Sequence, residues 1–455
     1  MGTRAIVIGA SMAGLLTARV LSEHADEVLV LERDELPIDN EQRRGVPQGR
    51  HAHALLAAGE QLVEEWFPGI VDELVAAGAV RGDGGDSRWY QSGAFKVRTD
   101  TGVPATCMSR PLLEGTVRRR VSQRPNVTVR SGVGVGSLVV SGPRITGVVV
   151  DGDAVGSDLV VDCTGRNSRF LDQLASAAFD APAISAVKID MSYATRILRR
   201  RDGDLDATFG IIAPTPPFDN RFGVLLPLEG DRWILTMGGF HGDTCPTDDE
   251  GYLAFARSLA VPFLADLLER AEVLSPVMTH RMATSQRRHV EKMRHAPAGF
   301  LVLGDAICSF NPIYGQGMSS AAQQAKALEN CLGRQALGSS SLAHSFYRKA
   351  AKVVDNPWQI AVGGDFLHPS TTGPKPPGTD LVNRYVGKVQ LASHVSPDVL
   401  TALTRVQNLL DPPPSLMRPS MMWKVRRAAR RSPAAGRRPI GDPHSRSADE
   451  VSQPA

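Results

Sequence analysis

The sequence predicts an α/β protein with a Rossmann-like domain, an inserted antiparallel sheet and C-terminal helices. A strand, a glycine-rich turn, a helix and a second strand follow one another between Arg4 and Glu32. Short alternating strands separated by Gly, Pro and Asp begin near Ala186, and helical patterns dominate after residue 316. A change from buried strands to alternating strands is typical of two units within one chain.

Length and composition place this chain among large globular proteins. Its 455 residues exceed the size at which a single hydrophobic core keeps growing. Hydrophobic residues make up 42% and charged residues 22%, which excludes a wholly disordered or fibrous chain. The net charge of +3 is uneven, because residues 424–455 carry +5 and the rest carries −2. We therefore expect no nucleic-acid partner, since nucleic-acid-binding proteins gather basic charge on a folded face.

The cysteines and the N-terminus indicate a cytoplasmic protein. The five cysteines are far apart and include no C-x-x-C pair, so neither disulfides nor a zinc site is expected. The chain enters an apolar strand at Ala5 without a signal peptide, and no stretch approaches the ~20 apolar residues of a membrane span. We expect no stable membrane insertion, and the sequence leaves the oligomeric state open.

The N-terminal unit carries a dinucleotide fingerprint. Strand Arg4–Ile8 is followed by a turn, a helix over about Met12 to His24 and strand Val28–Leu31. The turn approximates G-x-G-x-x-G, so its amides are expected to meet a pyrophosphate at the helix N-terminus. Glu32 ends the second strand, where a carboxylate accepts hydrogen bonds from a ribose. The candidate cofactor contacts are Gly9, Ser11, Met12, Ala13, Gly14, Glu32 and Arg33. This motif alone leaves NAD and FAD open.

Three later segments help to distinguish between NAD and FAD. An apolar strand over 158–163 runs into Thr164-Gly165, another over 300–303 ends in Gly304-Asp305, and residues 311–318 precede a long helix to about Leu337. Residues 132–137 also repeat glycine, but the alternation that follows predicts a hairpin rather than a second Rossmann unit. A nicotinamide donor would therefore bind without its own Rossmann domain.

Together these segments resemble the FAD-dependent monooxygenases of the p-hydroxybenzoate hydroxylase type. The resemblance implies that FAD is bound and that Asp305 accepts a hydrogen bond from the ribityl chain. It adds the following cofactor candidates: Gly165, Gly304, Asp305, Pro312, Gly315, Gln316, Gly317 and Met318. Amides at the start of the long helix suit a reduced flavin, because a helix N-terminus favours negative charge.

A closer resemblance, to a bacterial subgroup that contains polyether-pathway polyene epoxidases, rests on four segments: residues 44–53, 109–114, 193–196 and 308–318. It implies that Arg110 approaches the adenosine or pyrophosphate of FAD and that Arg44 and Gln48 lie on a loop near the flavin. His51 and His53 form an H-x-H pair, but no third ligand has suitable spacing, so no metal is expected.

The same resemblance divides the chain into five parts. The FAD-binding domain comprises residues 1–185 and 276–340, the substrate domain 186–275, a helical region 341–424 and a disordered basic tail 425–455. In the family the antiparallel sheet covers the flavin and lines the substrate cavity. Candidate lining residues are Phe209, Leu225, Thr236 and Gly238, although alternation alone favours a core position for each.

The function implied is that of an epoxidase-like monooxygenase. NADPH or NADH, or a separate flavin reductase, would reduce FAD, and O2 would add to give a flavin C4a-hydroperoxide. Its terminal oxygen would pass to a small lipophilic alkene or polyketide-like substrate. The chemistry is centred on the flavin, and no catalytic side chain is assigned. Alternatives are an aromatic hydroxylase, a reductase, a halogenase, whose W-x-W-x-I signature is absent from this sequence, and a protein that binds FAD or NAD without turnover.

Overall fold

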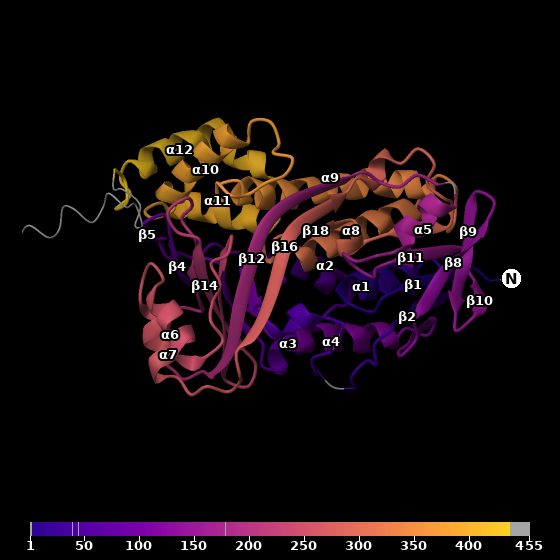
Figure 1. Ribbon diagram of the computed structural model, residues 1–455, viewed down its shortest axis with the longest axis horizontal. Helices are drawn as coiled ribbons and strands as arrows, with labels where there is room; N and C mark the ends of the chain where they lie inside the picture. Colours follow the sequence, from indigo (N-terminus) through magenta and orange to yellow (C-terminus); the bar gives the residue numbers. More distant parts are fainter. Residues whose placement is uncertain (1, 39, 44, 178, 437–455) are drawn as a thin grey trace, which may run out of the picture.

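The computed structural model describes residues 2–38, 40–43, 45–177 and 179–436. One layer is built on a five-stranded parallel sheet in the order β17-β11-β1-β2-β7 (Figure 1). The strands are β1 (Arg4–Ile8), β2 (Glu27–Leu31), β7 (Val127–Arg130), β11 (Leu159–Asp162) and β17 (Phe300–Val302). With α1 (Met12–Leu21) between β1 and β2, this sheet confirms the Rossmann-like unit.

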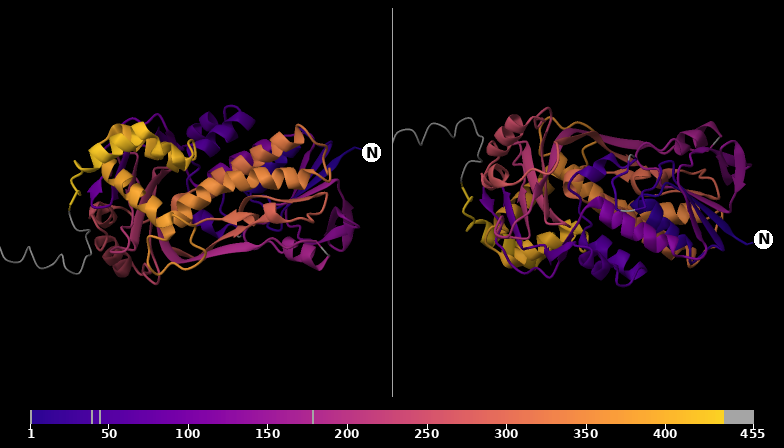
Figure 2. Two further views of the ribbon diagram at one scale, coloured as in Figure 1. Left: turned by 90° about the horizontal axis from the view of Figure 1, so that it is seen from above. Right: turned by 90° about the horizontal axis from the view of Figure 1, so that it is seen from below.

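Helices complete this domain. Helix α1 packs against α4 (Arg110–Ser122) and α8 (Gly317–Leu332), and α8 packs against α9 (Leu342–Asp365), as Figure 2 shows for the two long helices. Helix α8 ends before the expected Leu337, and α9 contains Pro357. The smaller helices of this part are α2 (Ala57–Trp66), α3 (Ile70–Ala76) and α5 (Phe170–Ser176).

The second layer is an eight-stranded sheet in the order β18-β16-β12-β15-β14-β13-β4-β5. Its strands are β4 (Ser87–Gln91), β5 (Ala94–Phe95), β12 (Ile184–Arg199), β13 (Phe209–Ile212), β14 (Arg221–Leu228), β15 (Arg232–Phe240), β16 (Met278–Arg288) and β18 (Cys308–Ser309). Helices α6 (Asp249–Arg257) and α7 (Phe263–Arg270) pack on it around a second core. The antiparallel insertion is confirmed, but the sheet extends beyond the expected residues 186–275.

Two smaller sheets lie in the N-terminal half. Strands β8 (Val135–Ser141), β9 (Arg144–Val150) and β10 (Asp153–Gly156) form an antiparallel meander, so the glycine repeat at 132–137 precedes a hairpin as expected. Strands β3 (Val80–Asp83) and β6 (Pro104–Cys107) pair antiparallel. Short 3₁₀ turns lie at η1 (Pro47–Arg50), η2 (Val290–Lys292), η3 (Gly304–Ala306), η4 (Pro312–Tyr314) and η5 (Pro413–Met417).

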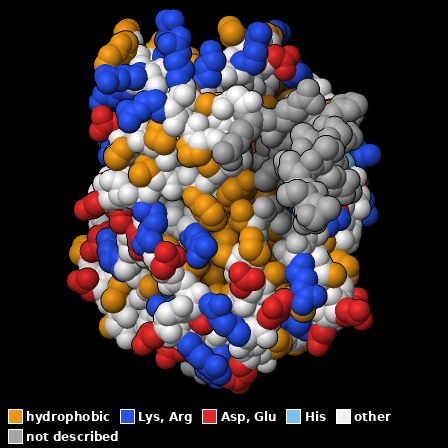
Figure 3. All heavy atoms as spheres, turned by 90° about the vertical axis from the view of Figure 1, so that its left-hand side faces the viewer, with side chains coloured by type: hydrophobic (Ala, Val, Ile, Leu, Met, Phe, Trp, Pro, Cys, Tyr) orange, Lys and Arg blue, Asp and Glu red, His pale blue; other side chains and the backbone are white. Residues whose placement is uncertain are grey.

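The C-terminal helices α10 (Thr379–Ala392), α11 (Pro397–Gln407) and α12 (Pro419–Ala429) share a core of their own. Helix α12 corrects the expected start of the disordered tail at residue 425, because an apolar side with Val425 and Ala429 packs onto α10. Residues 437–455 of that tail lie outside the described residues. Figure 3 shows the side of the molecule that lies on the left in Figure 1. Lys and Arg side chains gather at the top of this view, where the C-terminal helices lie in Figure 1. None of the helices described has the length and apolar character of a membrane span.

Replacing Gly14 with Ala should disrupt the packing of α1 on β1. A Cβ at this position would lie 1.8 Å from the backbone oxygen of Gly9, which has no flexible side chain to move aside. We expect a loss of at least about 2 kcal/mol in the free energy of unfolding in urea. The control is Gly387→Ala on α10, where a Cβ meets nothing within 4 Å and a gain of about 0.5–1 kcal/mol is expected. Equal effects of the two substitutions would contradict the packing argument.

Candidate functional site

The glycine-rich turn presents open amides to a cavity. Gly9 has φ +99°, and a Cβ there would lie 2.8 Å from the Cys163 backbone oxygen, so only glycine fits between β1 and β11. Ser11 precedes α1 but makes no capping hydrogen bond with its side chain. The amides of the first turn of α1 therefore remain free to bind an anion.

The carboxylate of Glu32 closes the other side of this turn. It accepts hydrogen bonds from the backbone amides of Ala10, at 2.7 Å, and Asp34, at 3.1 Å. It also pairs with Arg43, whose Nη1 lies 3.0 Å from Oε2. Glu32 is thus held at the end of β2 next to the amides of α1, where the fingerprint predicts it.

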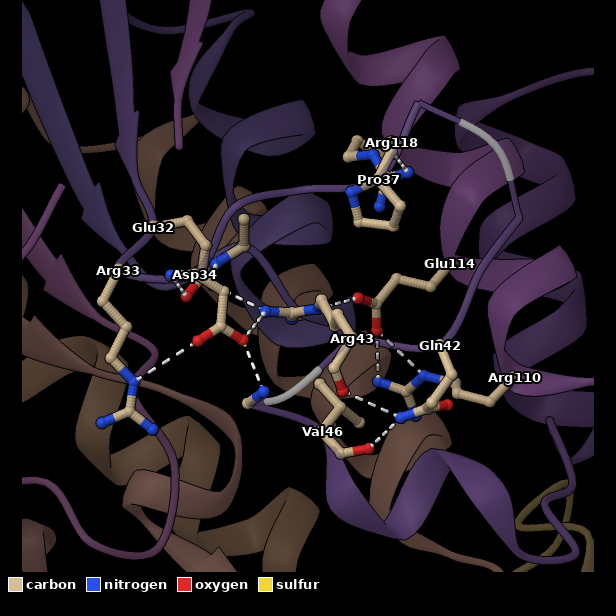
Figure 4. Close-up of polar contacts among 12 residues, drawn as sticks. Glu32, Arg33, Asp34, Pro37, Gln42, Arg43, Val46, Arg110, Glu114 and Arg118 are labelled. Atoms are coloured by element: carbon tan, nitrogen blue, oxygen red, sulfur yellow. Dashed lines mark hydrogen bonds and ion pairs between the residues drawn. The ribbon is translucent and has the colours of Figure 1, made fainter. Parts of the chain in front are cut away.

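A buried ionic network continues from Glu32 to α4 (Figure 4). Arg43 donates from Nε to Glu114 Oε1 at 2.8 Å, and Arg110 donates from Nε to Glu114 Oε2 at 3.0 Å. These four side chains are all less than 10% exposed. Burial alone would lower the pKa of Arg43, but Glu114 and Glu32 raise it above its ordinary value. Burial alone would raise the pKa of Glu114, but Arg110 and Arg43 lower it.

Asp305 and the start of α8 form the opposite side of the cavity. Gly304 has φ +72°, and a Cβ there would lie 2.7 Å from the Ala13 Cβ, so this glycine brings Asp305 close to α1. Burial raises the pKa of Asp305 to about 6, although Arg110 and Arg166 oppose the shift. Gln316, just before α8, is 1% exposed, and its Oε1 has no hydrogen-bond partner among the described residues.

Most of these groups line one cavity of about 1580 Å³. Most predicted cofactor contacts line it: Gly9, Ser11, Met12, Ala13, Glu32, Arg33, Gln48, Arg110, Gly165, Asp305, Pro312, Gly315, Gln316, Gly317 and Met318. Gly14 and Gly304 do not line the cavity and instead allow the close contacts described above. Arg44 lies outside the described residues. The role of each residue toward a cofactor remains a prediction.

The large sheet forms a second wall. Phe209 and Thr236, two of the four candidates, line the cavity. Leu225 instead belongs to the core under α6 and α7. Gly238 is packed against β12, where a Cβ would lie 2.7 Å from the Tyr193 Cβ. Alternation could not separate these cases, since one strand face turns to the cavity and the other to the core.

The H-x-H pair is hydrogen-bonded within the protein. His51 Nδ1 lies 2.7 Å from Thr195 Oγ1, and His53 Nδ1 lies 2.9 Å from the His51 backbone oxygen. Burial lowers the pKa of His51 to about 3 and that of His53 to about 4, so both rings are neutral at pH 7. Within the described ranges, no group of three or more His, Cys, Asp or Glu side chains is placed to hold a metal ion.

Several lining residues were not predicted. Tyr193 and His280 pair across β12 and β16 and face the cavity with ring centroids 5.5 Å apart. Arg43 and Glu114 organise the ionic network, although both stand in or beside segments that carried the family resemblance. The third wall comes from the C-terminal helices, including Val382, Val386 and Gln390 of α10. Their spacing of four residues is the helical signal that could have revealed α10.

Comparisons with known proteins agree with this geometry. A family model described as FAD binding domain matches residues 2–356. The curated protein called Protein Rv3254, from Mycobacterium tuberculosis (strain ATCC 25618 / H37Rv), is 34% identical over 432 residues, with 90% of each chain covered.

Solved structures share the fold. The flavin-dependent brominase Bmp2 superposes with a TM-score of 0.65 at 14% identity, over 94% of this chain and 99% of that chain. The protein pqsL, a probable FAD-dependent monooxygenase from Pseudomonas aeruginosa, gives a TM-score of 0.60 at 17% identity, over 80% and 94% of the two chains. At these identities the similarity shows the fold alone.

Removing Arg43 should destabilise the protein strongly. Arg43→Met would leave Glu32 and part of Glu114 unpaired in a buried place, at a cost of about 3–5 kcal/mol in the free energy of unfolding. The control is Arg257→Met, because Arg257 pairs with Glu269 at 2.8 Å with both side chains exposed. That exposed pair contributes at most about 1 kcal/mol. Similar losses in the free energy of unfolding for both variants, measured in urea, would show that the buried network contributes no more than an exposed ion pair.

Replacing Asp305 with Ala should weaken FAD binding. The variant loses an acceptor for a ribityl hydroxyl, at a cost of about 1–3 kcal/mol, which is a roughly tenfold to hundredfold higher Kd. Reconstitution of the cofactor-free protein followed by flavin fluorescence measures this. Asp202→Ala, on an exposed turn, serves as control. An Asp305→Ala protein that is folded and binds FAD as tightly as the wild type would show that Asp305 is only a turn residue without a role in FAD binding.

Proposed function

The chain belongs to the FAD binding domain family, and on this premise we propose that it is a monooxygenase for a lipophilic alkene or polyketide-like substrate. One oxygen atom from O2 enters that substrate, most simply as an epoxide. The single observation that carries the proposal is the continuous cavity, in which predicted cofactor contacts at one end meet apolar walls at the other.

The residues present suit FAD. The cavity exceeds the roughly 300–1,000 Å³ of ordinary ligand pockets, which leaves space for a dinucleotide and a substrate together. Free amides at the starts of α1 and α8 suit a pyrophosphate and a negatively charged ring. The orphan Gln316 Oε1 could accept a hydrogen bond from such a ring.

Each polar group then has a defined task. When bound, the flavin supplies the electrons and the activation of O2. The first turn of α1 would hold the pyrophosphate, and Glu32, fixed in place by its ion pair with Arg43, would accept a hydrogen bond from the ribose. Asp305 accepts from the ribityl chain, and Gly317 and Met318 turn their amides toward the ring. Arg110 adds positive charge near the phosphates without leaving its partner Glu114.

The walls of the large sheet support a lipophilic substrate. The side chains that line the cavity here are mostly apolar: Phe209, Ile211, Ile212, Phe222, Val224, Leu226 and Met282. Such walls exclude water from the reacting atoms. The resemblance of residues 44–53 and 308–318 to polyene epoxidases adds support for an alkene, and epoxidation needs no protein base.

Aromatic hydroxylation is the second candidate, and one observation favours it. His280 faces the cavity beside Tyr193, and burial lowers its pKa, so its ring is neutral near pH 7 and can accept a proton. A base of this kind helps to deprotonate a phenol. We propose NADPH or NADH as the electron donor in both cases, delivered directly or through a separate flavin reductase.

Oxygen transfer is tested with the FAD-loaded protein, NADPH and 18O2. We expect a terminal alkene such as 10-undecenoate to gain one 18O atom as an epoxide, and a phenol to be a poor substrate. A hydroxylated phenol in place of an epoxide would support the second candidate. Saturation of the double bond without O2 would instead make the protein a reductase.

A further inference from the structure

One end of the cavity is formed by a polar strand face. On β4, Trp89 and Gln91 line the cavity, whereas Tyr90 points the other way into the core under α6 and α7. Lys96 lies beside them, because its amide donates to the Trp89 backbone oxygen at 2.8 Å. Its Nζ sits 3.5 Å from the centroid of the Trp89 ring. Lys96 therefore lies on the cavity side of the sheet.

Helix α10 covers this strand face. The Val97 amide donates to the Ser393 backbone oxygen at 3.0 Å, and His394 Nε2 lies 2.9 Å from the Gln91 backbone oxygen. One turn earlier on the same helix, Gln390 lines the cavity and is only 9% exposed. Two distant parts of the chain thus bring Trp89, Gln91 and Gln390 to the cavity wall, with Lys96 beside Trp89.

These four side chains share an uncommon property. Within the described part of the chain, Lys96 Nζ, Trp89 Nε1, Gln91 Oε1 and Gln390 Oε1 are all buried without a hydrogen-bond partner. Lys96 is 5% exposed, and its pKa is lowered to about 7 by burial, with no carboxylate contributing to the shift. Native proteins rarely leave buried polar groups unsatisfied, and a buried cation without a counter-ion is especially costly.

We propose that this end of the cavity binds the carboxylate of an elongated apolar substrate, with Lys96 as its counter-ion. The Trp89 indole supplies a second donor, and the amides of Gln91 and Gln390 complete the site from either side. Each amide has an NH₂ group that donates and a carbonyl oxygen that accepts, so either side chain can turn its donor toward the carboxylate. The inference rests on the proposed function, because it narrows the substrate to an apolar chain with one acidic end.

A purely structural role fits these residues less well. Buried polar groups that only stabilise a fold satisfy one another, as the Arg43 network does with three ion pairs. Here Trp89, Gln91 and Gln390 instead border a cavity that is otherwise largely apolar, and Lys96 lies against the ring of Trp89. Removing Lys96 should therefore raise the thermal stability or leave it unchanged, whereas removing a structural lysine would lower it.

Binding to the FAD-loaded protein tests the site without any turnover. Isothermal titration calorimetry at pH 7 compares 10-undecenoate with 10-undecen-1-ol. We expect the wild type to bind the carboxylate at least about tenfold more tightly than the alcohol, since hydrogen bonds to a charged group are the strong ones. Lys96→Met should abolish this preference, and Trp89→Phe should reduce it. Lys388→Met, on the exposed side of α10, is the matched control and should bind both probes as the wild type does.

Three results would overturn the proposal: a wild type that fails to bind 10-undecenoate, equal affinities for acid and alcohol, or a folded Lys96→Met protein that keeps the preference. If Lys96→Met does not fold, Gln390→Leu takes its place, and loss of the acid preference is again expected. The outcomes for the proposed function can be distinguished from the outcomes for this binding site. Lys96-dependent binding of the acid without oxygen transfer would refute the monooxygenase alone, and epoxidation without any acid preference would refute this site alone.

Discussion

The charge pair between Arg43 and Glu32 is the interaction on which the rest of the site depends. Glu32 ends β2, Arg43 belongs to the loop that leads into η1, and Glu114 and Arg110 belong to the first two turns of α4. One guanidinium therefore fixes a long loop against a sheet and a helix through side chains that are each less than 10% exposed. Because the loop is held there, Gln48 and His53 face the cavity.

The parts of the molecule that the sequence predicted are those governed by local rules. The turn from Gly9 to Gly14 needs small residues at fixed spacing, and the pairing of β1 with β2 follows from one short crossover. The alternation of β12 to β15 likewise identified the antiparallel sheet. In each case neighbouring residues contain the whole signal.

What the sequence did not predict depends on distant partners. Lys96 and Gln390 are far apart in the chain, and only the folding of α10 onto β4 unites them. Arg43 stands next to the motif residue Arg44 and has no pattern of its own, so its three acidic partners could not be inferred. Strand β16 belongs to the large sheet through its pairing with β12, although it lies beyond the expected sheet residues 186–275. Helix α9 continues through Pro357, and this proline is buried.

Each of the two large sheets contains strands from distant parts of the chain, and this has a consequence for synthesis on the ribosome. Strand β17 completes the parallel sheet only after the whole antiparallel insertion has been translated, and β4 waits about as long for its partner β13. Neither sheet is therefore encoded by one contiguous stretch of the gene. Recombination that moves residues 186–275 alone would leave unpaired edges in donor and recipient, so this architecture favours inheritance of the two layers together.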